Sequence, residues 1–545
     1  MKKLFLAILA IGLAFSFAAC QGTSEEGVLN WNIGAEPLTI DPTLNGASDG
    51  GDVINQTFEG LVREKEGVIY PGIAESWETS ADGLTVTFTL RTSKWSDGSD
   101  LTASDFVYSF KRGMDPATAS EYAWIWEYTN IVGSMEAVYD GGSLDDVGVV
   151  ASDAKTLVIT LKQPTLYFVS LMAFYHFMPV KQSAVEAVGY EEGLWAASPT
   201  VVVSNGPFVL TEYTIGEGLV LEKNDHYWNK KETHLSKIVG KFIDDSQTAY
   251  NAYVAGELDI IPDVPPALVT TLIAENPDFY VFALFGTYYY NFNLEKPEWQ
   301  NVKLRKAMAY AINREVICET LGSGQVPAAG FVPPGMLDNN GLDFKEMAGL
   351  YGTAPDDANF DLAVTLFAQA ATEMGYTVTE LQTLLSTKVL MYNTSNAHKA
   401  VAELVQESWR VVLGIQMTLA NQEWSIFQDT RRDGLYDIAR GGWLTDFMDP
   451  AGMLAIFVTN NAYNDPNYNN PTFDTLMTEA QEATNAAIHF NKLYQAQAVL
   501  MNDMPVVPVY HYSDIIMVKD YVVGWSRSNL GSIDLSQAEI VVPAA

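Results

Sequence analysis

The residue types that most often perform catalysis or hold metal ions are scattered along this sequence. Its six histidines stand at positions 176, 226, 234, 398, 489 and 511, and none forms an H-E-x-x-H pair. The two cysteines, Cys20 and Cys318, are too few for a disulfide framework or a zinc site. There is no Walker loop, no G-x-G-x-x-G after a strand and no G-x-S-x-G elbow. The sequence therefore favours a binding protein without metal or cofactor over an enzyme, although its 67 acidic residues leave room for an unmarked carboxylate pair.

Four charged residues in the second half of the chain are of types that bind charged ligands. Each of them also has an ordinary structural explanation. His398 begins an amphipathic stretch and suits a helix cap or a core position, and Asp446 suits a turn. Arg440 suits a structural ion pair, and Arg431 suits the solvated surface. Their spacing alone does not decide between these explanations and a ligand site.

Both strands and helices are predicted among the elements that must position such residues. Strict alternation of apolar residues predicts strands at residues 84–91 and 156–162. Helical spacing predicts helices at residues 301–317 and 396–413, and the second would end at Gly414. This mixture indicates an α/β or α+β fold. At 545 residues the chain needs two or more domains, and the lack of a Pro/Gly linker favours domains that are discontinuous in sequence.

The first residues have the pattern of a secretion signal. Two lysines precede an apolar run at residues 4–19, which is short for a membrane span and right for a signal peptide. The run ends in F-A-A-C, which resembles a bacterial lipobox with Cys20 as the lipidated residue. An ordinary cleaved signal or an uncleaved anchor is the alternative. The sequence predicts a lipid-anchored protein outside the cytoplasm.

The net charge of −36 restricts the partners of the chain. A surface this acidic repels phosphate backbones, so nucleic acid is excluded as a partner. Solubility at high local concentration and a part in ligand choice both fit this charge.

Short motifs in order along nearly the whole chain resemble solute-binding protein family 5, the oligopeptide- and dipeptide-binding proteins of ABC importers. No single motif is specific, but the set together is. The motifs are FEGL (58–61), AESW (74–77), GLTVTFTLR (83–91), KWSDG (94–98), TASDFVYS (102–109), NGPF (205–208), AGELD (255–259), TYYYNFN (287–293), YNTSNAHK (392–399), NQEW (421–424) and YDIARGGW (436–443).

The resemblance implies an α/β fold of the class II, large periplasmic-binding-protein type, with two lobes that close on a ligand and an extra inserted subdomain. Residues 1–19 would be the lipoprotein signal peptide and residues 20–27 the lipidated tether. Lobe I would comprise residues 28–58, 184–285 and 514–545. The inserted subdomain would be residues 59–183, and lobe II would be residues 286–513.

The same resemblance implies the ligand and its contacts. The ligand would be an oligopeptide whose amino terminus meets Asp446. Its carboxyl terminus would meet His398, Arg431 or Arg440, depending on peptide length. The peptide backbone and side chains would contact Tyr122, Tyr289, Trp424, Gly442 and Trp443. The partners would be an ABC permease and its ATPase, and the binding protein itself would act as a monomer.

Two positions depart from the family pattern. Asn291 is neutral where several members carry an acidic residue, which does not favour lysine-containing peptides. The early loop at residues 45–48 is also not closely matched. Members of the family also bind nickel complexes, sugars or cell-wall fragments, so a non-peptide ligand is the alternative. A hydrolase, or a surface adhesin or peptide sensor, is a more distant one.

Overall fold

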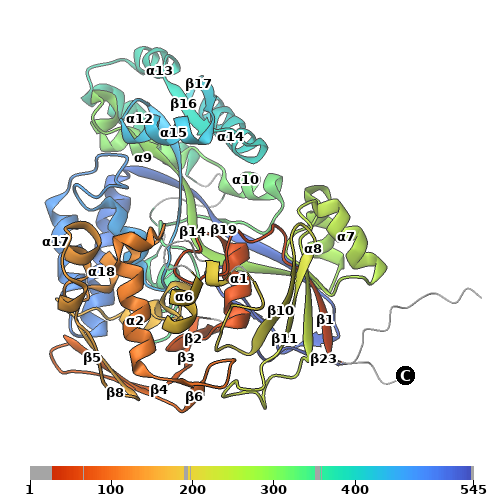
Figure 1. Ribbon diagram of the computed structural model, residues 1–545. Helices are drawn as coiled ribbons and strands as arrows, with labels where there is room; N and C mark the ends of the chain where they lie inside the picture. Colours follow the sequence, from red (N-terminus) through yellow and green to blue (C-terminus); the bar gives the residue numbers. More distant parts are fainter. Residues whose placement is uncertain are drawn as a thin grey trace, which may run out of the picture.

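A computed structural model describes residues 27–541, apart from residues 66, 189–193, 197, 350, 352–355 and 357–358. Cys20 and both predicted N-terminal segments up to residue 26 lie outside the described residues. Figure 1 shows α12 to α15 grouped at the top around β16 and β17, with β1, β10 and β11 at the lower right and β4, β5 and α2 at the lower left.

One sheet of eleven strands runs through the molecule. Its order is β10-β11-β12-β1-β13-β19-β14-β18-β16-β17, with β15 paired to β19. On one side lie β10 (Phe208–Thr214), β11 (Gly218–Lys223), β12 (Lys237–Lys241), β1 (Val28–Asn32) and β13 (Ile260–Ile261). On the other lie β18 (Ile438–Leu444), β16 (Val389–Asn393), β17 (Thr418–Gln422) and β15 (Val326–Pro327).

Two long antiparallel strands, β14 (Phe279–Phe292) and β19 (Val506–Val518), join the two sides of this sheet. Their register is regular from Phe279 to Ala283, breaks, and resumes at Thr287 opposite His511. Gly286 lies in this break, where a side chain would meet Leu444 and the carbonyl of Trp443. The break lies next to residue 285, the predicted limit between lobe I and lobe II.

Helices cover the lobe II part of the sheet. They are α9 (Val302–Tyr310), α10 (Arg314–Leu321), α11 (Phe344–Ala348), α12 (Phe360–Glu373), α13 (Val378–Ser386), α14 (Asn396–Leu413), α15 (Trp424–Arg432), α16 (Pro450–Leu454), α17 (Pro471–Gln481) and α18 (Ala486–Asp503). Helix α14 has the predicted bounds, and Gly414 ends it with a φ of 70°. The prediction of one helix at residues 301–317 is wrong. The side chain of Asn313 caps a second helix, so the chain breaks into α9 and α10.

Lobe I and the inserted subdomain carry the remaining elements. Lobe I has α1 (Ser48–Thr57), α7 (Ser246–Ala255), α8 (Pro266–Glu275) and the short C-terminal pairs β20 (Val522–Val523) with β23 (Glu539–Ile540) and β21 (Ser526–Arg527) with β22 (Ile533–Asp534). The predicted subdomain has the sheet β4 (Ala74–Thr79), β5 (Thr85–Leu90), β9 (Thr156–Thr160), β8 (Val149–Asp153), the hairpin β2 (Val62–Lys65) and β3 (Val68–Pro71), the pair β6 (Ser93–Lys94) and β7 (Asp100–Leu101), and helices α2 (Ala103–Met114), α3 (Trp126–Thr129), α4 (Ser134–Tyr139) and α5 (Phe168–Leu171). Helix α6 (Gln182–Val188) crosses the predicted limit between the subdomain and lobe I at residue 183.

The predicted strands of the subdomain are confirmed as β5 and β9, which pair directly from Thr85 opposite Thr160. Two large apolar cores result. One is shared by lobe I and the subdomain, and the other fills lobe II. Cys318 lies buried in α10. This division into two cores is the two-lobe, class II α/β architecture.

Candidate functional site

Strand β18 carries three of the residues singled out in the sequence, Arg440, Gly442 and Trp443. It lies in lobe II beside β14, with Arg440 opposite Tyr290 and Gly442 opposite Tyr288. Asp446 follows two residues after the strand ends at Leu444. A single extended segment therefore presents a cation and, a few residues later, an anion.

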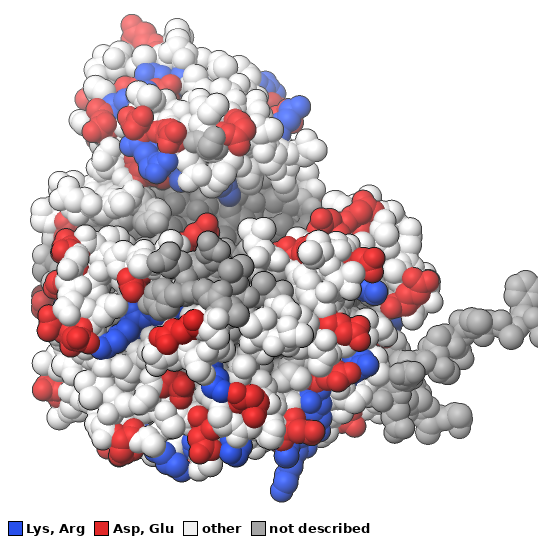
Figure 2. Space-filling model, in the orientation of Figure 1, with Lys and Arg blue, Asp and Glu red and all other residues white. Residues whose placement is uncertain are grey.

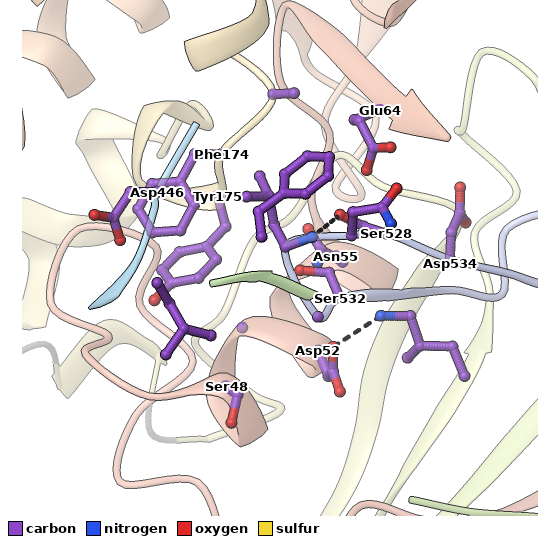
Figure 3. Close-up of a pocket in the computed structure, with 18 of the residues that line it drawn as sticks. Ser48, Asp52, Asn55, Glu64, Phe174, Tyr175, Asp446, Ser528, Ser532 and Asp534 are labelled. Carbon is purple, nitrogen blue, oxygen red and sulfur yellow. Dashed lines mark hydrogen bonds between the residues drawn. The ribbon is translucent and has the colours of Figure 1, made fainter. Parts of the chain in front are cut away.

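Asp446 borders a cavity of about 240 Å³ between the lobes. Figure 3 shows it beside Phe174 and Tyr175 on one side of the cavity, with Glu64 and Asp534 on the opposite side. The inserted subdomain supplies Tyr122, Phe174 and Tyr175, and lobe I supplies α1 and the C-terminal loop. The remaining polar lining is Ser48, Asp52, Asn55, Arg63, Thr445, Ser526, Ser528, Asn529 and Ser532.

The carboxylate of Asp446 is only partly exposed, and no described residue donates a hydrogen bond or forms an ion pair with it. Burial raises its pKa to about 7. Burial, followed by the charge of Asp446, raises the pKa of Tyr122 to about 12, so this hydroxyl stays protonated. No cation among the described residues pairs with the Asp446 carboxylate, so a cationic group of a ligand could do so.

Arg440 is the centre of a second cluster. Its Nη2 donates to the hydroxyl of Tyr512 at 2.8 Å, and its guanidinium lies 5.0 Å from the centre of the Tyr288 ring. The side chain is buried, and no carboxylate of the described residues pairs with it. The ring of His398 lies 5.5 Å from that of Tyr288. The structure thus brings Arg440 and His398 together around one tyrosine.

His398 is held neutral in this cluster. Burial, and then the charge of Arg440, lowers its pKa to about 4. Its Nδ1 has no partner among the described residues. The ring therefore offers one N–H and one acceptor to a ligand, and Arg440 supplies the positive charge.

Gly442 allows this cluster to form. A methyl carbon at this position would lie 2.6 Å from Arg440 Nη2 and 2.5 Å from the Tyr512 hydroxyl. The Arg440 side chain therefore runs along β18 in the direction of Asp446, and its guanidinium packs against the backbone of Gly442. Any side chain at Gly442 would displace it.

Arg431 is engaged within the protein. Its Nε lies 2.8 Å from a carboxylate oxygen of Asp465, and both side chains are largely buried. Its Nη1 also donates to the backbone oxygen of Arg440 at 3.4 Å. Arg431 is thus next to the Arg440 cluster but already has a counter-ion.

The four aromatic candidates lie in different surroundings. Tyr122 borders the cavity, with its ring 5.2 Å from that of Phe174. Trp443 is partly exposed, and its Nε1 donates to the carbonyl of Gly452 at 2.8 Å. Trp424 begins α15 and is 44% exposed. Tyr289 is buried against Phe331 and lies outside the cavity lining.

Two positions that depart from the family pattern also differ in surroundings. Asn291 is fully buried, and neither its amide nitrogen nor its oxygen has a partner among the described residues. The early loop lines the cavity through Gly46, Ala47 and Ser48. The loop is held by Asp41, which receives two hydrogen bonds from the buried Arg112.

Sequence reasoning missed several residues of the site. Tyr288 and Tyr512 surround Arg440, and Phe174, Tyr175 and residues 526–534 form the cavity wall. The alternation in Y-H-Y at residues 510–512 places Tyr510 and Tyr512 on one strand face, and this pattern is the signal that was available. The loop at residues 526–534 carries no such pattern.

Candidate membrane spans and metal-ion clusters are both absent from the described residues. None of their helices has the length and apolar character that a membrane span requires. Among the same residues, no three His, Cys, Asp or Glu side chains gather closely enough to hold a metal ion.

Comparison with known proteins identifies the family of this chain. The family model for bacterial extracellular solute-binding proteins, family 5, matches residues 68–465. The chain is 37% identical to the oligopeptide-binding protein OppA of Bacillus subtilis, over 93% of this chain and 91% of that protein. It is 34% identical to the periplasmic oligopeptide-binding protein OppA of Escherichia coli, over 95% and 93%. The chain belongs to solute-binding protein family 5.

Solved structures of related binding proteins are similar to this family 5 protein over nearly its whole length. It matches MppA, a periplasmic murein tripeptide-binding protein in an unliganded open form, with a TM-score of 0.82 at 30% identity, covering 95% of this chain and 98% of that one. A second structure, of the Escherichia coli murein tripeptide-binding protein MppA, matches with a TM-score of 0.72 at the same identity, covering 95% and 99%. Of these two solved structures, the unliganded open form of MppA is the more similar to this chain. Figure 2 shows the surface of this family 5 protein hollowed beneath the part that carries α12 to α15.

Proposed function

We propose that this protein captures short peptides with free ends outside the cytoplasm and delivers them to an ABC importer. The observation that carries the proposal is the pair of opposite charges on one stretch of chain, neither of which has a counter-ion within the described residues. Asp446 would receive the peptide ammonium, and Arg440 would receive the carboxylate. His398 would add a neutral hydrogen bond beside Arg440. Arg431 would support longer peptides only by leaving Asp465.

The separation of these groups sets the length of the ligand. Because the Arg440 guanidinium lies against Gly442, four residues of nearly extended chain separate it from Asp446. At the rise of a β-strand this is at most about 13 Å. An extended peptide of about three or four residues spans that distance, with its ends on the two charges.

The surroundings support a general peptide binder. A peptide laid along the end of β18 would form strand-like backbone hydrogen bonds, which are independent of its side chains. The cavity beside Asp446 gives room for the first side chain, and Tyr122 and Trp443 offer aromatic surface with one polar group each. The names of the related oligopeptide-binding proteins agree with this ligand class.

Lipidation of Cys20 would hold the protein at the outer face of a membrane, where a permease and its ATPase accept the ligand. The apolar run before F-A-A-C supports this part of the proposal. Replacing Cys20 by Ser should release the protein from membranes and abolish labelling by a radioactive fatty acid. Continued labelling would disprove the anchor.

Calorimetry with four forms of one tetrapeptide tests the ligand class. The free peptide should bind most tightly, the N-acetylated and C-amidated forms more weakly, and the doubly blocked form least. Chelator should have no effect. Equal affinity for all four forms, or no binding alongside tight binding of a sugar or a nickel complex, would replace peptides by the non-peptide alternative.

A further inference from the structure

A buried histidine behind the Asp446 loop has surroundings that fix its protonation. His489 lies in α18 with 2% of its surface exposed. Its Nδ1 is 2.8 Å from the carbonyl oxygen of Ala480, the penultimate residue of α17. Its Nε2 is 2.9 and 3.1 Å from the two carboxylate oxygens of Asp449, which is also buried. Both ring nitrogens therefore face oxygen acceptors.

With Asp449 ionised, only one protonation state of His489 satisfies both contacts. A neutral imidazole carries a single N–H, so one nitrogen would turn its lone pair toward an oxygen. A carbonyl cannot donate, and one Asp449 oxygen already accepts from the backbone N–H of Ala451 at 2.8 Å. The charges of the adjoining helices, Glu479 and Lys492, pair with each other at 2.6 Å. His489 fits this site as an imidazolium that donates from both nitrogens.

The acceptor Asp449 holds the loop that presents Asp446. Its side chain caps α16, and its backbone N–H donates to the carbonyl of Phe447 at 3.0 Å. Phe447 is buried in the core of the inserted subdomain and stacks on Tyr167, with ring centres 4.5 Å apart. Asp446 thus directly precedes Phe447, which packs on Tyr167 of the inserted subdomain. It also lies three residues before Asp449, which contacts His489 of lobe II.

We propose that His489 is a positioning residue for the ligand. As a buried imidazolium it fixes Asp449, and through Asp449 it holds the Asp446 carboxylate where a peptide ammonium meets it. The observation behind this proposal is that each ring nitrogen of His489 faces an oxygen acceptor, the Ala480 carbonyl at Nδ1 and the Asp449 carboxylate at Nε2. The effect on ligand binding rests on the proposed function, whereas the charge of His489 does not.

Nitrogen-15 spectra of the full mature chain test the charge. At pH 7.5 one imidazole should have both nitrogens protonated, and its signals should disappear in His489→Gln. In Asp449→Asn, the His489 ring should become neutral at this pH. A singly protonated His489 ring in the unmodified chain would overturn the proposal.

Binding measurements test the positioning. The ratio of affinities for a free tetrapeptide and its N-acetylated form should fall about tenfold in His489→Gln and stay unchanged in His234→Gln, a control at an exposed histidine. An unchanged ratio in His489→Gln would overturn the positioning role. If Asp446→Asn also left the ratio unchanged, the proposed function would fail instead, and the spectra would still decide the charge.

A further measurement needs no variant. Raising the pH of the unmodified chain until His489 loses its proton should increase hydrogen exchange at the amides of residues 446–449 and 451, after correction for the intrinsic rate. Unchanged protection of these amides would also overturn the proposal.

Discussion

The two charged ends of the proposed peptide site lie on one stretch of chain but are held in different ways. Arg440 is buried in a cluster of tyrosines, with a hydrogen bond from its guanidinium to Tyr512 and the ring of Tyr288 beneath it. Asp446 has no hydrogen-bond or ionic partner within the described residues. The cation is therefore oriented before a ligand arrives, whereas the anion depends on the ligand for its partner.

This difference has a consequence for protons. An arginine keeps its charge in any protein environment, so the Arg440 cluster is ready for a carboxylate at every physiological pH. Burial brings the pKa of Asp446 to about 7, so this residue is partly protonated near pH 7 when no ligand is bound. An arriving ammonium would favour the charged form and release a proton. The two ends should therefore respond differently to mutation and to pH.

The largest effect is expected at Arg440. Replacing it by Met removes the only charge in its cluster and should weaken a free tetrapeptide by about 3 kcal/mol, roughly 100-fold. The C-amidated peptide should lose little. Calorimetry measures both, and Arg432→Met is a matched control because Arg432 is exposed and pairs with Asp429. Equal losses for the free and amidated peptides would remove the assigned contact.

A smaller loss is expected at Asp446. Asp446→Asn keeps the shape and removes the charge, so a free tetrapeptide should weaken by about 2 kcal/mol, roughly 30-fold, and its N-acetylated form much less. In the unmodified protein, affinity should rise between pH 5.5 and 7.5 as Asp446 loses its proton. That rise should be absent in the variant and present in the exposed control Asp433→Asn. A rise that persists in Asp446→Asn would belong to another group.

The same residue should affect stability in the opposite sense. The pKa of Asp446 is near 7 when folded and near 4 when unfolded, so folding favours its protonated form. Its stabilising contribution is complete below pH 4 and is lost as the pH rises toward 7. Asp446→Asn should therefore raise the free energy of unfolding by about 1 kcal/mol at pH 8 and change it little at pH 4. Urea denaturation at the two pH values measures this, and a gain at pH 4 alone would contradict it.

The smallest effect is expected at His398. Because burial and Arg440 lower its pKa to about 4, His398 is neutral at pH 7 and His398→Gln should weaken a free tetrapeptide by only about 0.5 kcal/mol. In Arg440→Met the pKa of His398 should rise toward its ordinary value, since one cause of its lowering is removed. A proton NMR titration follows this change. An unaltered titration would show that Arg440 does not act on His398.

Much of the architecture could be predicted from the sequence because it depends on local patterns and on a family resemblance. Alternation gave the paired strands β5 and β9, and helical spacing with Gly414 gave the bounds of α14. The single helix predicted at residues 301–317 failed because apolar spacing continues across Asn313, while the polar side chain of that residue begins a new helix. Periodicity reports which residues are buried, but it does not report where the backbone breaks.

The sequence indicated several residues of the candidate site, but it did not indicate most of the contacts that these residues make. Family position indicated Asp446 and Arg440, and the structure shows what each one touches. That Arg431 faces Asp465 was not evident, because the two residues lie far apart in the sequence. The buried position of Tyr289 and the wall formed by residues 526–534 were hidden for the same reason, since each depends on contacts between distant segments.

The passage between the lobes bears on how such proteins diversify. The chain enters lobe II along β14 and returns along β19, and Ala283 lies directly opposite Ser513. The two ends of the segment from Ala283 to Ser513 are therefore neighbours in the sheet. Such a segment is a cassette that related proteins could exchange with little disturbance of either core. Asp446, Arg440 and His398 would all travel in the cassette, while Asp52, Phe174 and Ser532 would stay behind. Recombination could then alter the preference for the first side chain without altering how the two ends of a peptide are recognised.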